Sequence, residues 1–409
     1  MRILLIHQAF VGPNEAGGTR HHEIAQYLTQ QGHEFTIVAS DLSYLTGQRA
    51  VEGKGLVKEH NLDNVRVLRA YTYPSLHKSF VWRIISFLSF MITSVWAALR
   101  AGPIDIVIGT SPPIFQAVSA WLVAFLRRRP FLLEVRDLWP EFAIDMGVLK
   151  NPVLITLSRW LERFLYARAT HIVVNSPAYR DYLLKKGIAA EKITLIPNGV
   201  DATKFSSQAN GSAMREQFDL GDKFVVTYAG ALGIANDIGT ILHAADHLRS
   251  QHDIHFLLVG DGKERANLET QAHELGLPNV TFAGSHPKTA MPDILAASDA
   301  CIATLKDIPM FRTTYPNKVF DYMAAARPTV LAIDGVIRDV IETADGGIFV
   351  PPGDATALAK AIDDLNADRA RARAMGDAAR RYVVEHFDRR QQAGAFVELV
   401  ARLVVRRNA

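Results

Sequence analysis

Short apolar runs alternate with amphipathic stretches and polar, glycine-containing loops along this chain. Residues 2–6 are apolar enough to form a strand buried on both faces, and residues 20–31 carry a helical pattern that ends before Gly32. A second apolar run, 35–39, follows directly. Strand, helix and strand in this order predict a βαβ unit, and therefore an α/β fold with a parallel sheet.

The alternation continues to about residue 200, and a polar, glycine-containing stretch at 42–61 predicts a loop. A sharp turn at Asn198-Gly199 and a polar stretch at 206–212 mark a domain boundary. The predicted strands before this boundary are 65–70, 104–109, 131–135, 171–175 and 193–196, and the predicted helices are 80–99, 152–168 and 177–186.

The second half of the chain restarts the same plan. It predicts strands at 224–228, 255–259, 280–282, 300–303, 330–333 and 348–350, with helices between them and a long basic helical stretch at 371–407. Residues 395–405 have an apolar face that could dock back onto the first half. We therefore predict two doubly wound, Rossmann-like domains facing a central cleft, residues 1–200 and 201–385, with a C-terminal helix, 386–409, packing on the N-terminal domain.

The stretch FRTTYPNKVFDYMAAARP, residues 311–328, places a helix start, a lysine and an aspartate close together. Pro316 suits the first helical position, where its missing N–H is not needed. Lys318 and Asp321 are three residues apart and share a helix face, which would present a cation for phosphate and an acceptor for sugar hydroxyls beside an anion-attracting helix start. An amphipathic helix with a surface ion pair is the alternative.

Two loops offer further candidates at the carboxyl ends of predicted strands, where open α/β sheets bind ligands. Gly17 and Gly18 precede a helix and would let a phosphate approach backbone N–H groups, unless they only satisfy a turn. Arg136, Asp137 and Glu141 follow the strand at 131–135; the alternative is ordinary charges in a turn.

Residues 84–99 contain no charged side chain, which is unusual for a helix in contact with water. Three interpretations stay open: a buried core helix, a helix lying on a bilayer or facing a lipid-linked substrate, and a transmembrane span, for which about 20 apolar residues are needed. Basic residues nearby would add attraction to anionic lipid: Lys78, Arg83 and Arg127 to Arg129.

Composition excludes several classes of protein. The 409 residues include 45 Lys and Arg against 42 Asp and Glu, a net charge of +3 that gives no reason to expect nucleic acid as a partner. The single cysteine, Cys301, excludes an intramolecular disulfide, and no Cys or His pairs have metal-ligand spacing, so we expect no metal and a reducing cytoplasm. The initial apolar run is shorter than a signal peptide requires and fits a buried strand.

Taken together, the motifs resemble the retaining glycosyltransferases of family 4, which have the GT-B fold. The resemblance covers nearly the whole chain, and EVRDLWPE at 134–141 with the YPNK of the 311–328 stretch is similar to bacterial O-antigen and capsule enzymes of the fucosaminyltransferase-like group. The motifs that carry it are Gly17-Gly18, Gly32-His33-Glu34, residues 196–201, Gly230 with Gly233, Gly260-Asp261-Gly262 and residues 316–323.

The resemblance implies that the second domain binds a nucleotide sugar and the first presents the acceptor. It implies donor binding by backbone N–H groups of the glycine loops, by the Lys318 charge, by Asp321 at the ribose and by His286 near the base, with no metal required. The implied catalytic residues are Arg136, Asp137 and Lys318, and the implied donor-binding residues are Gly17, Gly18, Gly230, Gly233, His286, Arg312, Thr313, Asn317 and Asp321.

Three positions depart from the family pattern. Thr313 stands where the first motif glutamate is expected, and no Arg or Lys follows the Gly230 loop, which leaves Lys318 or Arg312 as substitutes. The family's frequent first-domain histidine corresponds to Arg136. Arg136 is therefore assigned to phosphate or acceptor, and Asp137 becomes a possible polar partner for sugar or acceptor.

We therefore expect a retaining glycosyltransferase that moves an N-acetylated amino sugar from a UDP-sugar to an undecaprenyl-diphosphate-linked glycan in surface polysaccharide synthesis. It would work in the cytoplasm, peripherally on the inner face of the plasma membrane. A UDP-sugar 2-epimerase with the same fold and a non-catalytic nucleotide-sugar-binding relative are the alternatives.

Overall fold

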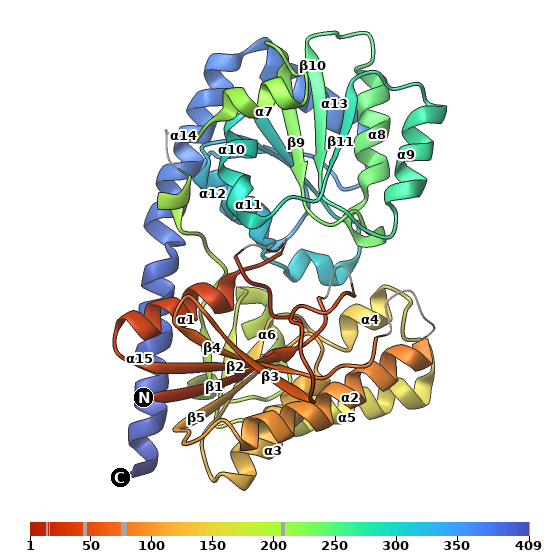
Figure 1. Ribbon diagram of the computed structural model, residues 1–409. Coiled ribbons are helices and arrows are strands. Elements are labelled where there is room, and N and C mark those ends of the chain that lie inside the picture. Colours follow the sequence, from red (N-terminus) through yellow and green to blue (C-terminus); the bar gives the residue numbers. More distant parts are fainter. Residues whose placement is uncertain (14, 16, 44–46, 75–79, 206–208, 409) are drawn as a thin grey trace. The chain divides into compact units, whose positions relative to one another are not determined.

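The computed structural model describes residues 1–13, 15, 17–43, 47–74, 80–205 and 209–408, and the chain forms two compact units (Figure 1). The first unit comprises residues 1–12, 19–197 and 390–409. The second comprises residues 13–18 and 198–389.

The first unit is built on an eight-stranded sheet in the order β3-β4-β2-β1-β5-β6-β7-β8, parallel except for the β3–β4 pair. The order reverses between β1 and β5, which is the position where doubly wound sheets bind ligands. The strands are β1 (Arg2–Ile6), β2 (Glu34–Ser40), β3 (Val57–Leu62), β4 (Val65–Ala70), β5 (Ile106–Thr110), β6 (Phe131–Val135), β7 (His171–Val174) and β8 (Ile193–Leu195).

Helices cover both faces of this sheet. The apolar side chains Phe396, Leu399 and Val400 of the last helix pack into one core cluster with those of the first helix and the sheet. The helices of this unit are α1 (Arg20–Gln30), α2 (Phe80–Leu99), α3 (Phe115–Leu126), α4 (Glu141–Asp145), α5 (Pro152–Arg168), α6 (Pro177–Lys185) and α15 (Arg389–Asn408).

The second unit has a six-stranded, fully parallel sheet in the order β11-β10-β9-β12-β13-β14, which reverses between β9 and β12. Its strands are β9 (Phe224–Ala229), β10 (Ile254–Val259), β11 (Val280–Gly284), β12 (Ala300–Thr304), β13 (Thr329–Ala332) and β14 (Gly347–Phe349). Its helices are α7 (Gly211–Gln217), α8 (Ile238–His247), α9 (Arg265–Glu274), α10 (Met291–Ala296), α11 (Asn317–Ala324), α12 (Val336–Thr343), α13 (Ala355–Ala367) and α14 (Arg369–His386).

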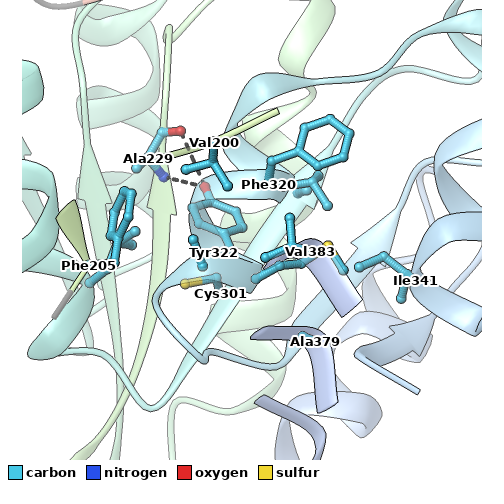
Figure 2. Packing of buried hydrophobic residues seen from close by; sticks show 14 of the residues in the cluster. Val200, Phe205, Ala229, Cys301, Phe320, Tyr322, Ile341, Ala379 and Val383 are labelled. Carbon is cyan, nitrogen blue, oxygen red and sulfur yellow. Dashed lines mark hydrogen bonds between the residues drawn. The ribbon is translucent and has the colours of Figure 1, made fainter. Parts of the chain in front are cut away.

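Alternate residues of β9 enter two different apolar cores, because successive strand side chains point to opposite faces. Val225 and Ala229 join the core that also contains α11, and Val226 and Tyr228 join the core that contains α8 and α13. Figure 2 shows the first of these cores, where Tyr322 of α11 stands between strand and helix side chains. The sheet is thus buried on both faces, as parallel sheets require.

Three predictions about individual elements were wrong or incomplete. The predicted loop 42–61 contains most of β3, an edge strand whose polar, half-exposed side chains hide its pairing with β4. The predicted helical stretch 371–407 is two helices, α14 and α15, separated at Phe387. The polar stretch 206–212 lies partly outside the described residues, and its end belongs to α7.

Helix α2 confirms the predicted helix at 80–99. Within the described residues, no helix has the length and hydrophobicity needed to cross a membrane. Lys78 lies outside the described residues, and the side chain of Arg83 is not among those described.

Candidate active site

The donor-site candidate in the second unit centres on the start of α11. The structure makes Pro316 the N-cap, with φ of −66°, so the helix begins at Asn317, one residue later than predicted. Val319 and Phe320 turn into the core. The first backbone N–H groups of a helix lack partners in a preceding turn, and Lys318 is the second residue of this helix.

Lys318 is held by neutral groups. Its Nζ lies 2.8 Å from the Tyr228 hydroxyl and 3.3 Å from Asn236 Oδ1, and it stands 4.0 Å from the centre of the Tyr228 ring. In the described part of the chain no carboxylate lies within ion-pair distance of this ammonium group. Burial lowers the pKa of Lys318 to about 7. An anion beside Nζ would supply the missing negative charge.

Asp321 does not pair with Lys318, so the surface ion pair considered for this helix is not formed. Its carboxylate pairs instead with Lys288 Nζ, a residue that the sequence did not single out. The lysine and the aspartate that the sequence places on one helix face therefore have separate partners.

Tyr322, one turn after Lys318, fixes the helix to the end of β9. Its hydroxyl accepts a hydrogen bond from Ala229 N at 2.8 Å and donates to Ala229 O at 3.2 Å (Figure 2). Because Ala229 follows Tyr228, this anchor holds Lys318 against the Tyr228 hydroxyl. The Tyr228 hydroxyl in turn donates to Ala231 O at 2.8 Å, inside the glycine loop.

Gly230 leaves room for the Lys318 ammonium group, because a side chain here would displace it. A Cβ at this position would stand 2.9 Å from Lys318 Nζ, which is closer than real Cβ atoms come. The predicted offer of the Gly230 N–H to phosphate is wrong, because that group continues the parallel ladder and donates to Val259 O at 2.9 Å. Gly260 packs on this loop so closely that a Cβ there would lie 1.8 Å from Gly230 O. Gly233 precedes a 3₁₀ turn at Ile234–Asn236, whose last residue contacts Lys318.

Gly17 and Gly18 belong to the segment 13–18, which the structure groups with the second unit. A Cβ on Gly18 would lie 3.4 Å from Asn317 Nδ2, so this loop approaches the first residue of α11. Among the described residues, Asn317 Oδ1 is buried without a hydrogen-bond partner. The loop and the helix start thus bring an amide, glycines and free N–H groups to one place.

The remaining donor-site candidates have partners of their own. Arg312 is exposed and pairs with Asp307 at 2.9 Å, so the structure favours Lys318 over Arg312 as the substitute for the missing basic residue. Thr313 donates its hydroxyl hydrogen to Met310 O at 2.5 Å. His286 follows β11 and contacts Ala283 O through Nε2 at 3.1 Å.

Arg136 and Asp137 directly follow β6 in the first unit and are half-buried. Ser111, which follows β5, accepts a hydrogen bond from Arg136 N at 3.0 Å. Burial raises the pKa of Asp137 to about 6, although Ser111 and Arg136 oppose this rise. Its Oδ1 is buried and has no hydrogen-bond partner in the described residues. Glu141, by contrast, pairs with Arg159 at 2.8 Å.

A buried chain of polar groups runs inward from Arg136. Arg136 Nη1 lies 3.4 Å from His7 Nε2, His7 Nδ1 lies 3.0 Å from His21 Nδ1, and His21 Nε2 contacts Glu134 Oε2. Since arginine can only donate and a carboxylate can only accept, one proton arrangement satisfies every link. His7 then carries its proton on Nδ1 and His21 on Nε2, so both rings are neutral.

The pKa shifts agree with this arrangement. Burial lowers the pKa of His7 well below its usual range, and burial also lowers that of His21 despite Glu134. Burial alone would raise the pKa of Glu134, but His21 and Arg20 together bring it well below its usual range. Arg20 Nε holds the other carboxylate oxygen at 2.9 Å. Glu134 is therefore a buried anion with two partners.

Arg20 also links this cluster to the turn that follows β8. Its Nη1 and Nη2 donate to the carbonyl oxygens of Pro197 and Ile196 at 2.7 and 2.9 Å. The first residue of α1, the strand β6 and the first two residues of the 196–201 motif are thereby joined through one guanidinium group.

Sequence reasoning missed several residues that hold the candidates in place: Tyr228, Asn236, Lys288, His7, His21, Glu134 and Ser111. A signal was available for some of them, because His7 follows β1, Ser111 follows β5 and Tyr228 lies near the end of β9, at the carboxyl ends where ligands bind. No group of three His, Cys, Asp or Glu side chains within the described ranges could hold a metal ion.

Comparisons with known proteins match both halves of the chain. Residues 16–199 match the family described as glycosyl transferase 4-like domain, and residues 212–382 match glycosyl transferases group 1. The putative colanic acid biosynthesis glycosyl transferase WcaI of Escherichia coli is 25% identical over 351 residues, 83% of this chain and 86% of WcaI. The probable glycosyltransferase WbjE of Pseudomonas aeruginosa is 25% identical over 276 residues, 66% of this chain and 68% of WbjE.

Solved structures agree on the fold. A sucrose-phosphate synthase from Thermosynechococcus elongatus has a TM-score of 0.77 at 20% identity, covering 99% of both chains. The Anabaena protein HepE, solved with UDP and glucose, has a TM-score of 0.74 at 19% identity, covering 98% of this chain and 99% of HepE. The chain is an enzyme, a glycosyltransferase with two Rossmann-like domains of the GT-B type. Its relatives WcaI and WbjE are named as a putative and a probable glycosyltransferase.

Proposed function

We propose that this glycosyltransferase transfers an N-acetylated amino sugar, with retention of anomeric configuration, from a UDP-sugar to an undecaprenyl-diphosphate-linked glycan during synthesis of a surface polysaccharide. The observation that carries the proposal is the Lys318 ammonium group, half-buried at the start of α11 between the neutral acceptors of Tyr228 and Asn236. A group of this kind is suited to a phosphate ligand, because the ligand completes its charge balance.

The chemistry of transfer asks for such a group. When the sugar leaves, negative charge grows on the diphosphate, and donors already in place stabilise it without reorganisation. Lys318 would supply a charge and the start of α11 a helix dipole, so that no metal ion is needed at this position. Gly17, Gly18 and Gly233 remain candidates for backbone contacts to the diphosphate.

The remaining donor contacts follow from the resemblance and stay proposals. Asp321 would accept from the ribose, although a donor must then share or displace its Lys288 partner. His286 would lie near the base and Asn317 near the sugar or diphosphate, where its free Oδ1 could accept a hydrogen bond. UDP as the nucleotide is supported by the likeness to HepE, which was solved with UDP and glucose.

On the acceptor side we propose roles for Arg136 and Asp137. The unpartnered Asp137 Oδ1 could accept a hydrogen bond from a sugar hydroxyl of donor or acceptor, and Arg136 would contact a phosphate or the acceptor. The chain of His7, His21 and Glu134 would hold Arg136 in position. The surface-polysaccharide setting is supported by WcaI, whose name places it in colanic acid biosynthesis.

A panel of nucleotide sugars scored for thermal stabilisation tests the donor, because a ligand that binds only the folded state raises its apparent stability, by about 2.7 kcal/mol at a hundred times its Kd. We expect UDP-linked N-acetylated amino sugars to stabilise most. Transfer to a synthetic undecaprenyl-diphosphate-linked sugar then tests the reaction. Stabilisation by GDP-sugars alone would rule out a UDP-sugar as the donor. Isomerisation of the nucleotide sugar in the absence of an acceptor would rule out glycosyl transfer as the reaction.

A further inference from the structure

The outer surface of the first unit is unusually apolar over three of its helices. Of the seventeen large apolar side chains that are exposed in the described part of the chain, eleven lie on α2, α3 and α5. Soluble monomers rarely gather so many in one place, and such a patch marks an interaction site. We call it the three-helix surface: Trp82, Ile85, Leu88, Ile92, Trp96, Phe125, Leu126, Val153, Leu154, Leu157 and Trp160.

The three helices form one continuous layer. They connect β4 to β5, β5 to β6 and β6 to β7, all in the same direction along the sheet, so right-handed crossovers place them on one face. Phe87 of α2 stacks on Phe115 of α3 at 5.4 Å between ring centres, and Trp121 of α3 meets Phe164 of α5 edge-on at 4.8 Å. Figure 1 shows α2, α3 and α5 side by side.

Helical spacing turns the exposed side chains outward together. Ile85, Leu88, Ile92 and Trp96 follow one another at intervals of three and four, so they form a single stripe along α2 whose most exposed member is Ile92, at 73%. The first turns of α5 are equally apolar and exposed. An Asn151 side-chain cap, which accepts from Val153 N and Leu154 N, stabilises them where packing does not.

The charges around this surface select its partner. The only acidic residue within the three helices is Glu162, which is buried and bonded to Lys186. Basic residues lie at the helix ends, where Arg100 covers the Trp96 ring at 4.0 Å, Arg127 donates to Leu99 O, and Arg129 and Lys150 are exposed. Two more exposed arginines lie within α5: Arg159, which pairs with Glu141, and Arg163. A surface whose exposed side chains on these helices are mainly apolar or basic complements an anionic membrane.

We infer that the three-helix surface docks on an anionic lipid bilayer, with its apolar side chains entering the interface and Arg129 and Lys150 near the headgroups. A two-fold contact between copies of the chain would instead bring like charges together, which disfavours it. Exposed tryptophans on both α2 and α5 suit the membrane interface, because each ring is apolar with one polar edge. The inference rests on the proposed function only in that a lipid-linked acceptor requires access to a bilayer.

Flotation of the purified full chain with vesicles of phosphatidylglycerol, and with vesicles of phosphatidylcholine, tests the docking surface. We expect the chain to float with the anionic vesicles and to be released by high salt. The triple variant Ile92→Gln, Leu157→Gln, Trp160→Gln should partition at least tenfold less, whereas Val384→Gln, an exposed apolar position on α14 outside this surface, should float normally. Arg129→Gln with Lys150→Gln should weaken binding to the anionic vesicles alone.

Equal flotation of the triple variant and the unaltered chain would overturn the inference. A second set of results would also overturn it: the unaltered chain does not float, sedimentation shows that it self-associates, and the triple variant is monomeric. The surface would then join copies of the chain. Transfer to a short-chain, water-soluble acceptor should be unchanged in the triple variant, which shows that the variant is folded. If the chain floats as expected but transfers sugar to no acceptor, the proposed function fails and the docking surface stands.

Discussion

Lys318 Nζ lies 2.8 Å from the hydroxyl of Tyr228, a residue ninety positions earlier in the chain. The hydroxyl donates its own hydrogen to Ala231 O, so the lone pair that faces Lys318 is fixed. The pair joins the start of α11 to the glycine loop after β9. A phosphate ligand that contacted both the start of α11 and this loop would find the Lys318 ammonium group already held in position.

Tyr228→Phe removes this support and leaves the ring in its core. We expect the KM for the nucleotide sugar to rise roughly tenfold to a hundredfold, because a hydrogen bond to a charged group contributes about 1.5–3 kcal/mol, and kcat to change less. Steady-state kinetics measures both. Tyr182→Phe is the control, since its hydroxyl bonds Glu162 at 3.1 Å in the first unit. An unchanged KM in Tyr228→Phe would mean that the pair does not position the donor.

Donor binding should depend on pH through Lys318. Burial lowers the pKa of Lys318 to about 7, so Lys318 loses its charge in the free enzyme as pH rises above 7. Binding of a diphosphate would restore this charge, because Lys318 would take up a proton when the anion binds. We expect the Kd of a UDP-sugar to rise by up to roughly tenfold per pH unit above pH 7. Calorimetry in buffers of different ionisation enthalpy measures the proton uptake. A Kd that is flat between pH 7 and 9 would contradict the assignment.

Asp137 should set an acid limb in the rate profile. Burial raises the pKa of Asp137 to about 6, so its carboxylate is lost as pH falls through 6, and an acceptor for a sugar hydroxyl is lost with it. We expect kcat/KM to decline below pH 6, and Asp137→Asn to lower kcat/KM at pH 8 while abolishing that decline. Asp145→Asn, on the exposed side of α4, should leave the profile as it is. A decline that persists in Asp137→Asn would assign the limb to another group.

Glu134→Gln should destabilise the protein, because it leaves Arg20 buried without its anion. We expect a loss of about 3–5 kcal/mol in the free energy of unfolding at pH 7. Glu141→Gln, which breaks the partly exposed pair with Arg159, should cost about 0–1 kcal/mol. The folded-state pKa of Glu134 is lowered, so its contribution is present above its unfolded pKa and lost as pH falls. Denaturant titrations in which the deficit of Glu134→Gln failed to shrink toward acid would contradict this account.

The sequence predicted what depends on local pattern. Parallel strands and α11 follow from buried apolar runs and helix signals, and Lys318 was found because its helix start is a local signal. The helix α3 was missed because its outer face is apolar as well, so no polar period marks it. The strand β3 was missed because an edge strand exposes one side.

The partners of the candidate residues could not be predicted, because they depend on which strands are neighbours. Tyr228 meets Lys318 only because β9 lies beside β12 in the sheet and α11 follows β12. His7 meets Arg136 because β1, β5 and β6 are adjacent, although they are far apart in the chain. Asp321 and Lys318, three residues apart, looked like a pair and are not, since Lys288 from another loop reaches the carboxylate.

The most direct test of the central claim is the binding of a UDP-sugar to Lys318→Met, measured by calorimetry beside turnover. Methionine replaces the ammonium group with an apolar chain of similar length, so the ligand-free fold should persist with unchanged circular dichroism. We predict that turnover is abolished and that UDP-sugar affinity falls at least tenfold and no longer varies between pH 7 and 9. Near-normal turnover with unchanged affinity in this variant would place the donor site elsewhere.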